Sequence, residues 1–170
     1  MKRNTLFDGC QILALDKKHD ERGYFCRLSD SSWLPSGYEF HQISVSINVS
    51  PLTLRGIHFQ KSMDKEYKIV SVIQGEIYDV LVDVRPGSNT YLDYWSANLS
   101  SEDSRAILVA PGIAHGFLTL TPNTIVHYSM SDKFSQVNYS GLIWDDPKIQ
   151  IAWPRIPLVI SNQDQNWKRL

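Results

Sequence analysis

The sequence predicts an all-β protein, a jelly-roll barrel of the cupin-like kind with short helical turns. Short runs of β-branched and aromatic residues follow one another, and turn residues separate them at regular intervals. His58 lies on one such run and His115 comes just after another, and polar groups of this kind in an all-β chain are expected to point into a barrel mouth. A chain of 170 residues can bury one substantial core, so we expect a single domain over residues 1–170.

The clearest strand is the alternating stretch 42–49. Its apolar residues, such as Ile43 and Val45, alternate with polar ones, such as Ser44, which is typical of a half-buried strand with its apolar face in the core. The strand that carries His58 follows it. Further strands are expected over 67–73, 77–84, 91–99, 106–110, 117–120 and 125–130, with turns at 74–76 and 85–88. Helical turns are expected only near 30–34 and after 100, and the tail from Trp144 onward is expected to be irregular.

Charge and composition exclude several classes of function. The formal net charge is −1 and the two signs are interleaved, which argues against nucleic acid as a partner. The sequence has no run of eighteen apolar residues and no signal-peptide core near Met1, so we expect no membrane segment and a cytoplasmic location. Cys10 and Cys26 are isolated and are expected to be reduced thiols.

A cation precedes His58 by three positions in Leu54-Arg55-Gly56-Ile57-His58-Phe59-Gln60. On an ideal strand, Arg55 and His58 leave opposite faces, unless Gly56 marks a bulge that redirects one of them. A strand with charged side chains that face the barrel interior needs a polar partner there. An anionic ligand would be such a partner.

A metal site is the alternative use of these histidines. Metal-binding strands typically present His-x-His, which places both rings on one face, but Gln60 stands two positions after His58. The carboxylates shortly downstream are Asp64 and Glu66. We therefore expect no metal and no cofactor.

Without a metal, a histidine can act as a general base because its ordinary pKa is close to neutrality. It then needs an orienting carboxylate, an acid that returns the proton, and a cation near the developing oxyanion. Spacing alone leaves several candidates open for each role. They are Asp79, Asp83, Asp145, Asp146 or Asp164 for the carboxylate, Tyr128 or Tyr78 for the acid, and Lys68 or Arg55 for the cation.

Four segments in order resemble the dTDP-4-dehydrorhamnose 3,5-epimerase family. They are 54–60 (LRGIHFQ), 75–85 (GEIYDVLVDVR), 111–117 (PGIAHGF) and 144–147 (WDDP). The resemblance runs from 20–25 (DERGYF) to 161–164 (SNQD), and so covers nearly the whole chain. It implies a metal-free, cupin-type homodimer that inverts carbons beside the 4-keto group of a nucleotide-linked 6-deoxyhexose, with dTDP-4-dehydro-6-deoxy-D-glucose as the first candidate.

The resemblance also implies a role for each of ten residues. His58 resembles the base that takes the proton beside the carbonyl, and Asp164 resembles the carboxylate that orients it. Tyr128 resembles the acid that returns a proton to the other face. Lys68 resembles the cation beside the enolate oxygen, and His115 resembles a second imidazole next to it. The residues expected at the diphosphate are Arg22 and Arg55, and those expected at the rest of the nucleotide sugar are Phe25, Gln42 and Gln60.

Five positions depart from the pattern of the family, and none of them belongs to the acid–base set. They are Arg27, Ser44, Phe134, Ile143 and Gln163. The departures predict that the reaction type is kept while the nucleotide preference has shifted. They leave open whether C3, C5 or both are inverted. The alternatives are an epimerase that acts at one carbon of another nucleotide-linked 4-keto sugar, and a non-catalytic protein that binds nucleotide sugars.

Overall fold

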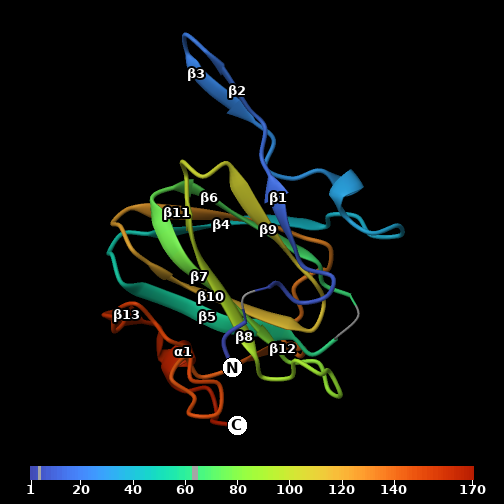
Figure 1. Ribbon diagram of the computed structural model, residues 1–170, viewed down its shortest axis with the longest axis vertical. Coiled ribbons are helices and arrows are strands. Elements are labelled where there is room, and N and C mark those ends of the chain that lie inside the picture. Colours follow the sequence, from blue (N-terminus) through green and yellow to red (C-terminus); the bar gives the residue numbers. More distant parts are fainter. Residues whose placement is uncertain (4, 63–64) are drawn as a thin grey trace.

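The computed structural model describes residues 1–3, 5–62 and 65–170 and contains two antiparallel sheets packed face to face (Figure 1). The five-stranded sheet has the order β1 (Gln11–Ala14), β9 (Arg105–Val109), β6 (Lys68–Gln74), β11 (Thr124–Met130) and β4 (Gln42–Asn48). The six-stranded sheet has the order β12 (Tyr139–Gly141), β5 (Thr53–Gln60), β10 (Ile113–Thr119), β7 (Glu76–Asp83) and β8 (Tyr94–Ser100), with β13 (Val159–Ile160) parallel to β5. The predicted all-β jelly-roll class is confirmed.

The central strands are buried on both faces because further layers cover the outside of each sheet. Residues such as Val70, Leu81 and Phe117 fill the space between the sheets. The tail after Trp144 packs on the outer face of the six-stranded sheet, and residues 28–40 pack on the outer face of the five-stranded sheet. Two buried faces remove the alternation that marks a strand in the sequence. For this reason β10 begins at Ile113, four residues before the predicted start.

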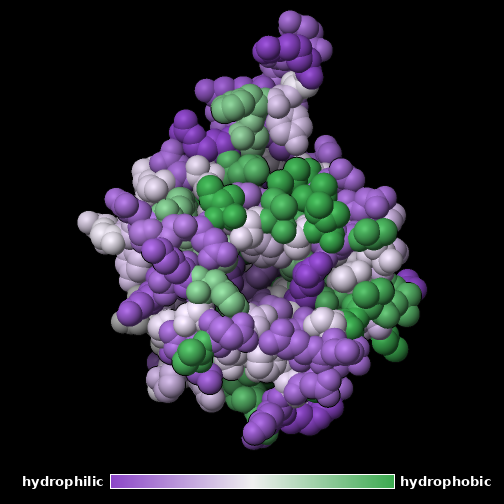
Figure 2. All heavy atoms as spheres, turned by 180° about the vertical axis from the view of Figure 1, so that it is seen from behind, coloured by the Kyte–Doolittle hydropathy of each residue, from purple (hydrophilic) through white to green (hydrophobic). Residues whose placement is uncertain are grey.

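β4 is a strand as predicted, but the prediction of its buried face was wrong. Its apolar side chains Ile43, Val45 and Ile47 are 67%, 57% and 62% exposed and point away from the barrel. Its polar side chains, including Ser44 and Ser46, line a pocket between the sheets instead. Figure 2, which shows the molecule from behind, has a group of hydrophobic residues beneath the projecting hairpin. The apolar face of β4 points outward because this end of the barrel encloses polar groups rather than a hydrophobic core.

A bulge in β5 brings Arg55 and His58 to the same side. His58 pairs with His115 and Arg55 pairs with Phe117, so β5 has one residue more than β10 over this interval. At Gly56 the backbone φ is +125°, and a Cβ there would lie 2.5 Å from the Cα of Gly116 on β10. Glycine is therefore required at Gly56, and the bulge that the sequence left open is present.

Several elements were not predicted. β2 (Lys17–Asp20) and β3 (Gly23–Cys26) form a hairpin that projects from the barrel in Figure 1. The tail is irregular as expected, apart from β13 and the short helix α1 (Asn162–Gln165). The predicted helical turn is a 3-10 helix over Ser31–Trp33, capped by Asp30.

Both cysteines are free thiols, as expected. In the part of the chain that the structure describes, no helix has the length and hydrophobicity needed to span a membrane.

Candidate active site

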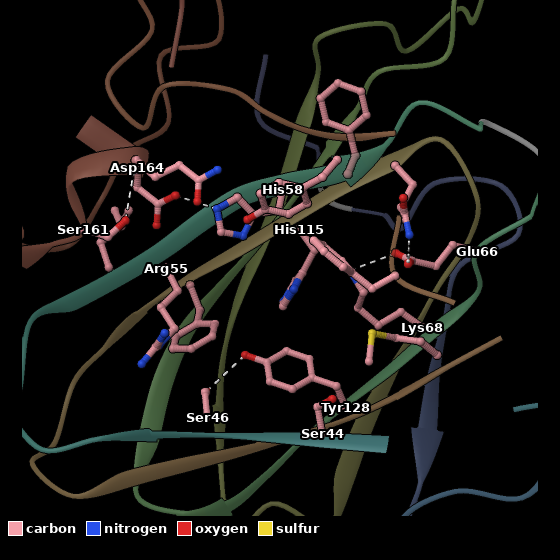
Figure 3. Close-up of a pocket in the computed structure, with 18 of the residues that line it drawn as sticks. Ser44, Ser46, Arg55, His58, Glu66, Lys68, His115, Tyr128, Ser161 and Asp164 are labelled. Carbon is pink, nitrogen blue, oxygen red and sulfur yellow. Dashed lines mark hydrogen bonds and ion pairs between the residues drawn. The ribbon is translucent and has the colours of Figure 1, made fainter. Parts of the chain in front are cut away.

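A pocket of about 640 Å³ opens between the two sheets, and residues of β4, β5, β6, β10, β11 and the tail line it. It brings together eight of the ten residues that the sequence singled out. In Figure 3, His58 and Tyr128 lie on opposite sides of this pocket and His115 lies between them. The eight residues are Gln42, Arg55, His58, Gln60, Lys68, His115, Tyr128 and Asp164.

His58 is held by Asp164 on one wall of the pocket. Its Nε2 donates to Asp164 Oδ1 at 2.6 Å, and the His58 side chain is 26% exposed. Asp164 lies in the first turn of α1, where its backbone N–H donates to Ser161 Oγ at 3.1 Å. Burial alone would raise the pKa of Asp164, but hydrogen bonds from His58, Gly56 N and Trp167 lower it below its ordinary value. The carboxylate therefore stays ionised and fixes the imidazole through one ring nitrogen, which leaves Nδ1 for the pocket.

His115 forms a second imidazole–carboxylate pair, with Asp79 on β7. Its Nε2 donates to Asp79 Oδ1 at 2.6 Å, and the two side chains are 4% and 0% exposed. The other oxygen, Asp79 Oδ2, is buried without a hydrogen-bond partner among the described residues. The sequence offered Asp79 only as a possible partner of His58. The alternation of β7 was the available signal, because it places Asp79 on the same inner face as Ile77 and Leu81.

Tyr128 lies on β11, in the sheet opposite His58. Its hydroxyl shares a hydrogen bond of 3.2 Å with Ser46 Oγ, and its ring centroid lies 6.4 Å from that of His115 in an edge-on arrangement. Burial raises the pKa of Tyr128. The phenol consequently keeps its proton at neutral pH and lines the pocket as an uncharged group.

Lys68 lies on the pocket wall in an ion pair that the sequence did not predict. Its Nζ is 3.2 Å from Glu66 Oε1, and both side chains are 13% exposed. Gln60 Nε2 donates to the second oxygen of Glu66 at 3.2 Å. Glu66 was considered only as a metal ligand, and Asp64, considered with it, lies outside the described residues. No group of three or more His, Cys, Asp or Glu side chains in the described ranges is placed to hold a metal ion.

Arg55 and Gln42 also line the pocket, and each has a hydrogen-bond partner. Arg55 Nε donates to Asn48 Oδ1 at 2.7 Å, and Gln42 Oε1 accepts from the backbone N–H of Phe134 at 3.1 Å. Of the five departing positions, Ser44, Phe134 and Gln163 line the pocket. Arg27 instead pairs with Asp30 outside it. Ile143 does not line the pocket either.

The structure does not bring Arg22 and Phe25 into the pocket of their own chain. Both lie on the β2–β3 hairpin, where Arg22 pairs with Asp20 and the Phe25 residue is 69% exposed. The hairpin extends beyond the barrel and carries both residues away from it (Figure 1).

The two aspartates of the Trp144-Asp145-Asp146-Pro147 turn, which spacing left as candidates for the orienting carboxylate, have structural partners instead. Asp146 accepts from the backbone N–H groups of Lys148 and Leu170, each at 2.8 Å.

Comparisons with known proteins show the family of this chain. The sequence model of the family described as dTDP-4-dehydrorhamnose 3,5-epimerase matches residues 4–170. The dTDP-4-dehydrorhamnose 3,5-epimerase of Methanothermobacter thermautotrophicus is 40% identical over 98% of this chain and 92% of its own. The crystal structure of the Bacillus anthracis str. Ames enzyme of that name, with TDP and PPi bound, is 35% identical, with a TM-score of 0.90 over 98% of this chain and 97% of that one.

A second crystal structure is similar to the same extent. It is the dTDP-6-deoxy-D-glucose-3,5-epimerase of Legionella pneumophila Philadelphia 1 in complex with dTDP-4-keto-L-rhamnose. It is 31% identical, with a TM-score of 0.89 over 98% of this chain and 90% of that one.

Proposed function

Because the chain belongs to the dTDP-4-dehydrorhamnose 3,5-epimerase family, we propose that it is an isomerase that converts dTDP-4-dehydro-6-deoxy-D-glucose into dTDP-4-dehydro-L-rhamnose. The observation that carries the proposal is the pocket with the His58–Asp164 pair on one wall and Tyr128 on the other. Relatives of known structure hold TDP or dTDP-4-keto-L-rhamnose, which supports this substrate class.

The first step is removal of a proton from the carbon beside the 4-keto group. We assign this step to His58, whose Nδ1 is free to accept while Nε2–H donates to Asp164. The buried carboxylate stabilises the imidazolium that forms, as the carboxylate of a catalytic triad does. The electron pair of the broken C–H bond forms the C=C bond of an enolate. The negative charge of this enolate is on O4 of the sugar.

The enolate oxygen needs positive charge or hydrogen-bond donors in a site that excludes water. Lys68 lines the pocket and supplies positive charge, and the His115 imidazole, held by Asp79, lines the pocket with it. The Glu66 carboxylate 3.2 Å from Lys68 keeps the lysine ammonium in place before substrate arrives. Because the local dielectric is low, a fixed cation here lowers the barrier more than it would in water.

Inversion requires that the proton return to the other face of the carbon. A base that returned its own proton to the same face would restore the starting sugar. Tyr128 is the donor that we assign, because it lies on the sheet opposite His58 and its raised pKa keeps the phenol protonated. Its hydroxyl gives H⁺ to the enolate carbon, and solvent or His58 then reprotonates the phenolate.

One experiment separates this function from the alternatives. Purified protein is incubated with dTDP-4-dehydro-6-deoxy-D-glucose, and the configuration at C3 and C5 of the product is read by proton NMR. Inversion at both carbons supports the 3,5-epimerase. Inversion at one carbon identifies a mono-epimerase, and binding without conversion identifies a non-catalytic nucleotide-sugar protein. The diphosphate substrate does not cross a bilayer, so we place the reaction in the cytoplasm.

A homodimer forms part of the proposal. The exposed apolar face of β4, formed by Ile43, Val45 and Ile47, supports it, because such a strip at a sheet edge is normally covered. The projecting hairpin also supports it, because Arg22 can then reach the nucleotide of the partner subunit.

The dimer has its own test. Light scattering at micromolar concentration should give twice the chain mass for the wild type and for the control Ile156→Asp, which changes an exposed residue of the tail. Val45→Asp should give the mass of one chain, because it places a charge in the centre of the apolar face. A fully active wild-type monomer would rule out the dimer.

A further inference from the structure

Trp167, in the C-terminal tail, contacts the His58–Asp164 pair from outside the pocket. Its indole Nε1–H donates to Asp164 Oδ1 at 3.2 Å, and this is the same oxygen that accepts from His58 Nε2 at 2.6 Å. Its ring lies 6.2 Å from the His58 ring and 5.8 Å from the Tyr139 ring, edge-on in both cases. Trp167 does not line the pocket, so any effect on substrate passes through Asp164, His58 or Tyr139.

The backbone beside the base leaves room for this indole. Gly141 on β12 pairs directly with His58 on β5. A Cβ at Gly141 would overlap Cε2 and Nε1 of Trp167. The indole therefore packs against bare backbone opposite the base, and a glycine at this position is what permits the hydrogen bond to Asp164.

The rest of the tail is fixed as well. Arg169 NH2 pairs with Asp145 Oδ2 at 3.0 Å, and the backbone N–H of Leu170 donates to Asp146 Oδ2 at 2.8 Å. Chain ends are usually loose unless contacts of this kind hold them. The conspicuous Trp-Asp-Asp-Pro turn thus anchors the segment that carries Trp167.

We propose that Trp167 is a positioning residue that fixes Asp164 and lowers the proton affinity of the His58–Asp164 pair. The inference rests on the proposed function of His58 as the base. A second donor on the same carboxylate oxygen stabilises the ionised form and disperses its charge, so the carboxylate attracts the proton on His58 less strongly.

The other titratable groups around the pair do not replace this effect. Burial and the charge of Asp164 raise the pKa of Tyr139 to about 12, so the phenol stays neutral over the working range. His115, opposite His58 on β10, already has its own carboxylate in Asp79. Arg55 on β5 donates to Asn48 Oδ1 instead.

The test compares Trp167→Phe with Trp153→Phe. Trp167→Phe keeps an aromatic ring but loses the donor to Asp164. Trp153 is a matched control, because its Nε1–H donates to the backbone oxygen of Trp144 at 2.9 Å in the same tail, away from the base. The His58 imidazole is titrated by NMR in both variants without substrate, and the pH dependence of kcat/KM is measured beside it.

Trp167→Phe should raise the titration midpoint of His58, and with it the acidic limb of kcat/KM, by about 0.5–1 pH unit, with KM unchanged at high pH. Trp153→Phe should shift neither. Gly141→Ala, which displaces the indole, should reproduce the shift as a second variant. A His58 midpoint unchanged in Trp167→Phe overturns the proposal, even if kcat falls. A shifted midpoint in a protein without epimerase activity would contradict the proposed function instead.

Discussion

His58 and His115 lie directly opposite each other where β5 pairs with β10, and each is held by its own carboxylate. The two carboxylates come from different parts of the chain, since Asp164 lies in the tail helix and Asp79 lies on β7. Both imidazoles use Nε2 for the carboxylate and keep Nδ1 for the pocket. The pairing places two carboxylate-bound imidazoles side by side on one sheet.

The two pairs should differ in what they contribute to stability. His115→Ala leaves the Asp79 carboxylate fully buried without a partner, which should lower the free energy of unfolding by about 3–5 kcal/mol. His58→Ala should cost only about 1–2 kcal/mol, because Asp164 keeps its donors Gly56 and Trp167. Urea unfolding at pH 7 and one protein concentration measures both. Equal losses in the free energy of unfolding would mean that Asp79 is more accessible to water than the structure indicates.

Tyr128→Phe should separate proton removal from proton return. Solvent exchange at the substrate carbon should stay within about tenfold of wild type, whereas formation of inverted product should fall by about 10²–10⁴-fold. Ser46→Ala is the control, because it removes only the hydroxyl that bonds to Tyr128 and leaves the acid in place. Mass spectrometry for exchange and NMR for product check the two rates. If exchange and inversion fall together, Tyr128 is not the acid.

Affinity for the nucleotide should depend on Arg55. Arg55→Ala should weaken binding of thymidine diphosphate by about 1.5–3 kcal/mol, the usual range for a hydrogen bond to a charged group. Arg105→Ala is the control, because Arg105, at the start of β9, pairs with Asp103 and does not line the pocket. Calorimetry with wild type and both variants gives the values. A loss below about 0.5 kcal/mol would remove Arg55 from the phosphate site.

The same calorimetry tests which nucleobase the pocket prefers. Ser44, Phe134 and Gln163 line the pocket at positions that depart from the family pattern. We therefore expect guanosine, cytidine and uridine diphosphates to bind within about tenfold of thymidine diphosphate, or about 1.4 kcal/mol. If thymidine diphosphate binds far more tightly than the others, the departures leave the selection of the nucleobase intact. No binding of any of them would contradict the nucleotide-sugar function.

The stability of the fold should depend on pH through Asp83. Burial would raise the pKa of this carboxyl, but hydrogen bonds from Arg85, Ser88 and Thr90 lower it to about 2. A depressed pKa stabilises the fold above the ordinary value near 4, and this stabilisation is lost as pH falls from about 4 to about 2. It amounts to about 2 kcal/mol at pH 7.

Unfolding of Asp83→Asn against wild type provides the measurement. The difference in unfolding free energy should be largest at pH 6 and should shrink as the pH falls from about 4 to about 2. Asp103→Asn, which removes a more exposed ion pair with Arg105, should show a smaller change over the same range. A difference for Asp83→Asn that stays constant from pH 6 to pH 3 would mean that its hydrogen bonds do not favour the ionised form.

Much of the fold could be predicted from the sequence, because alternation, turn residues and strand length are local properties. Alternation in β4 correctly showed which residues share a face. It could not show which face is inside, because that depends on a pocket formed by the opposite sheet. The partnerships of Asp79 with His115 and of Trp167 with Asp164 likewise depend on strand register and on the path of the tail. Neither partnership can be predicted from the residues that adjoin these positions in the sequence.

The central claim, that His58 removes the proton beside the 4-keto group, is tested most directly in heavy water. Wild-type protein and His58→Ala are incubated in D₂O with dTDP-4-dehydro-6-deoxy-D-glucose, and deuterium at C3 and C5 is followed by NMR. The account predicts label at both carbons of the wild-type product, and exchange slowed by at least about 10²–10⁴-fold at both carbons in His58→Ala. Exchange in His58→Ala at a rate near that of the wild type would contradict it.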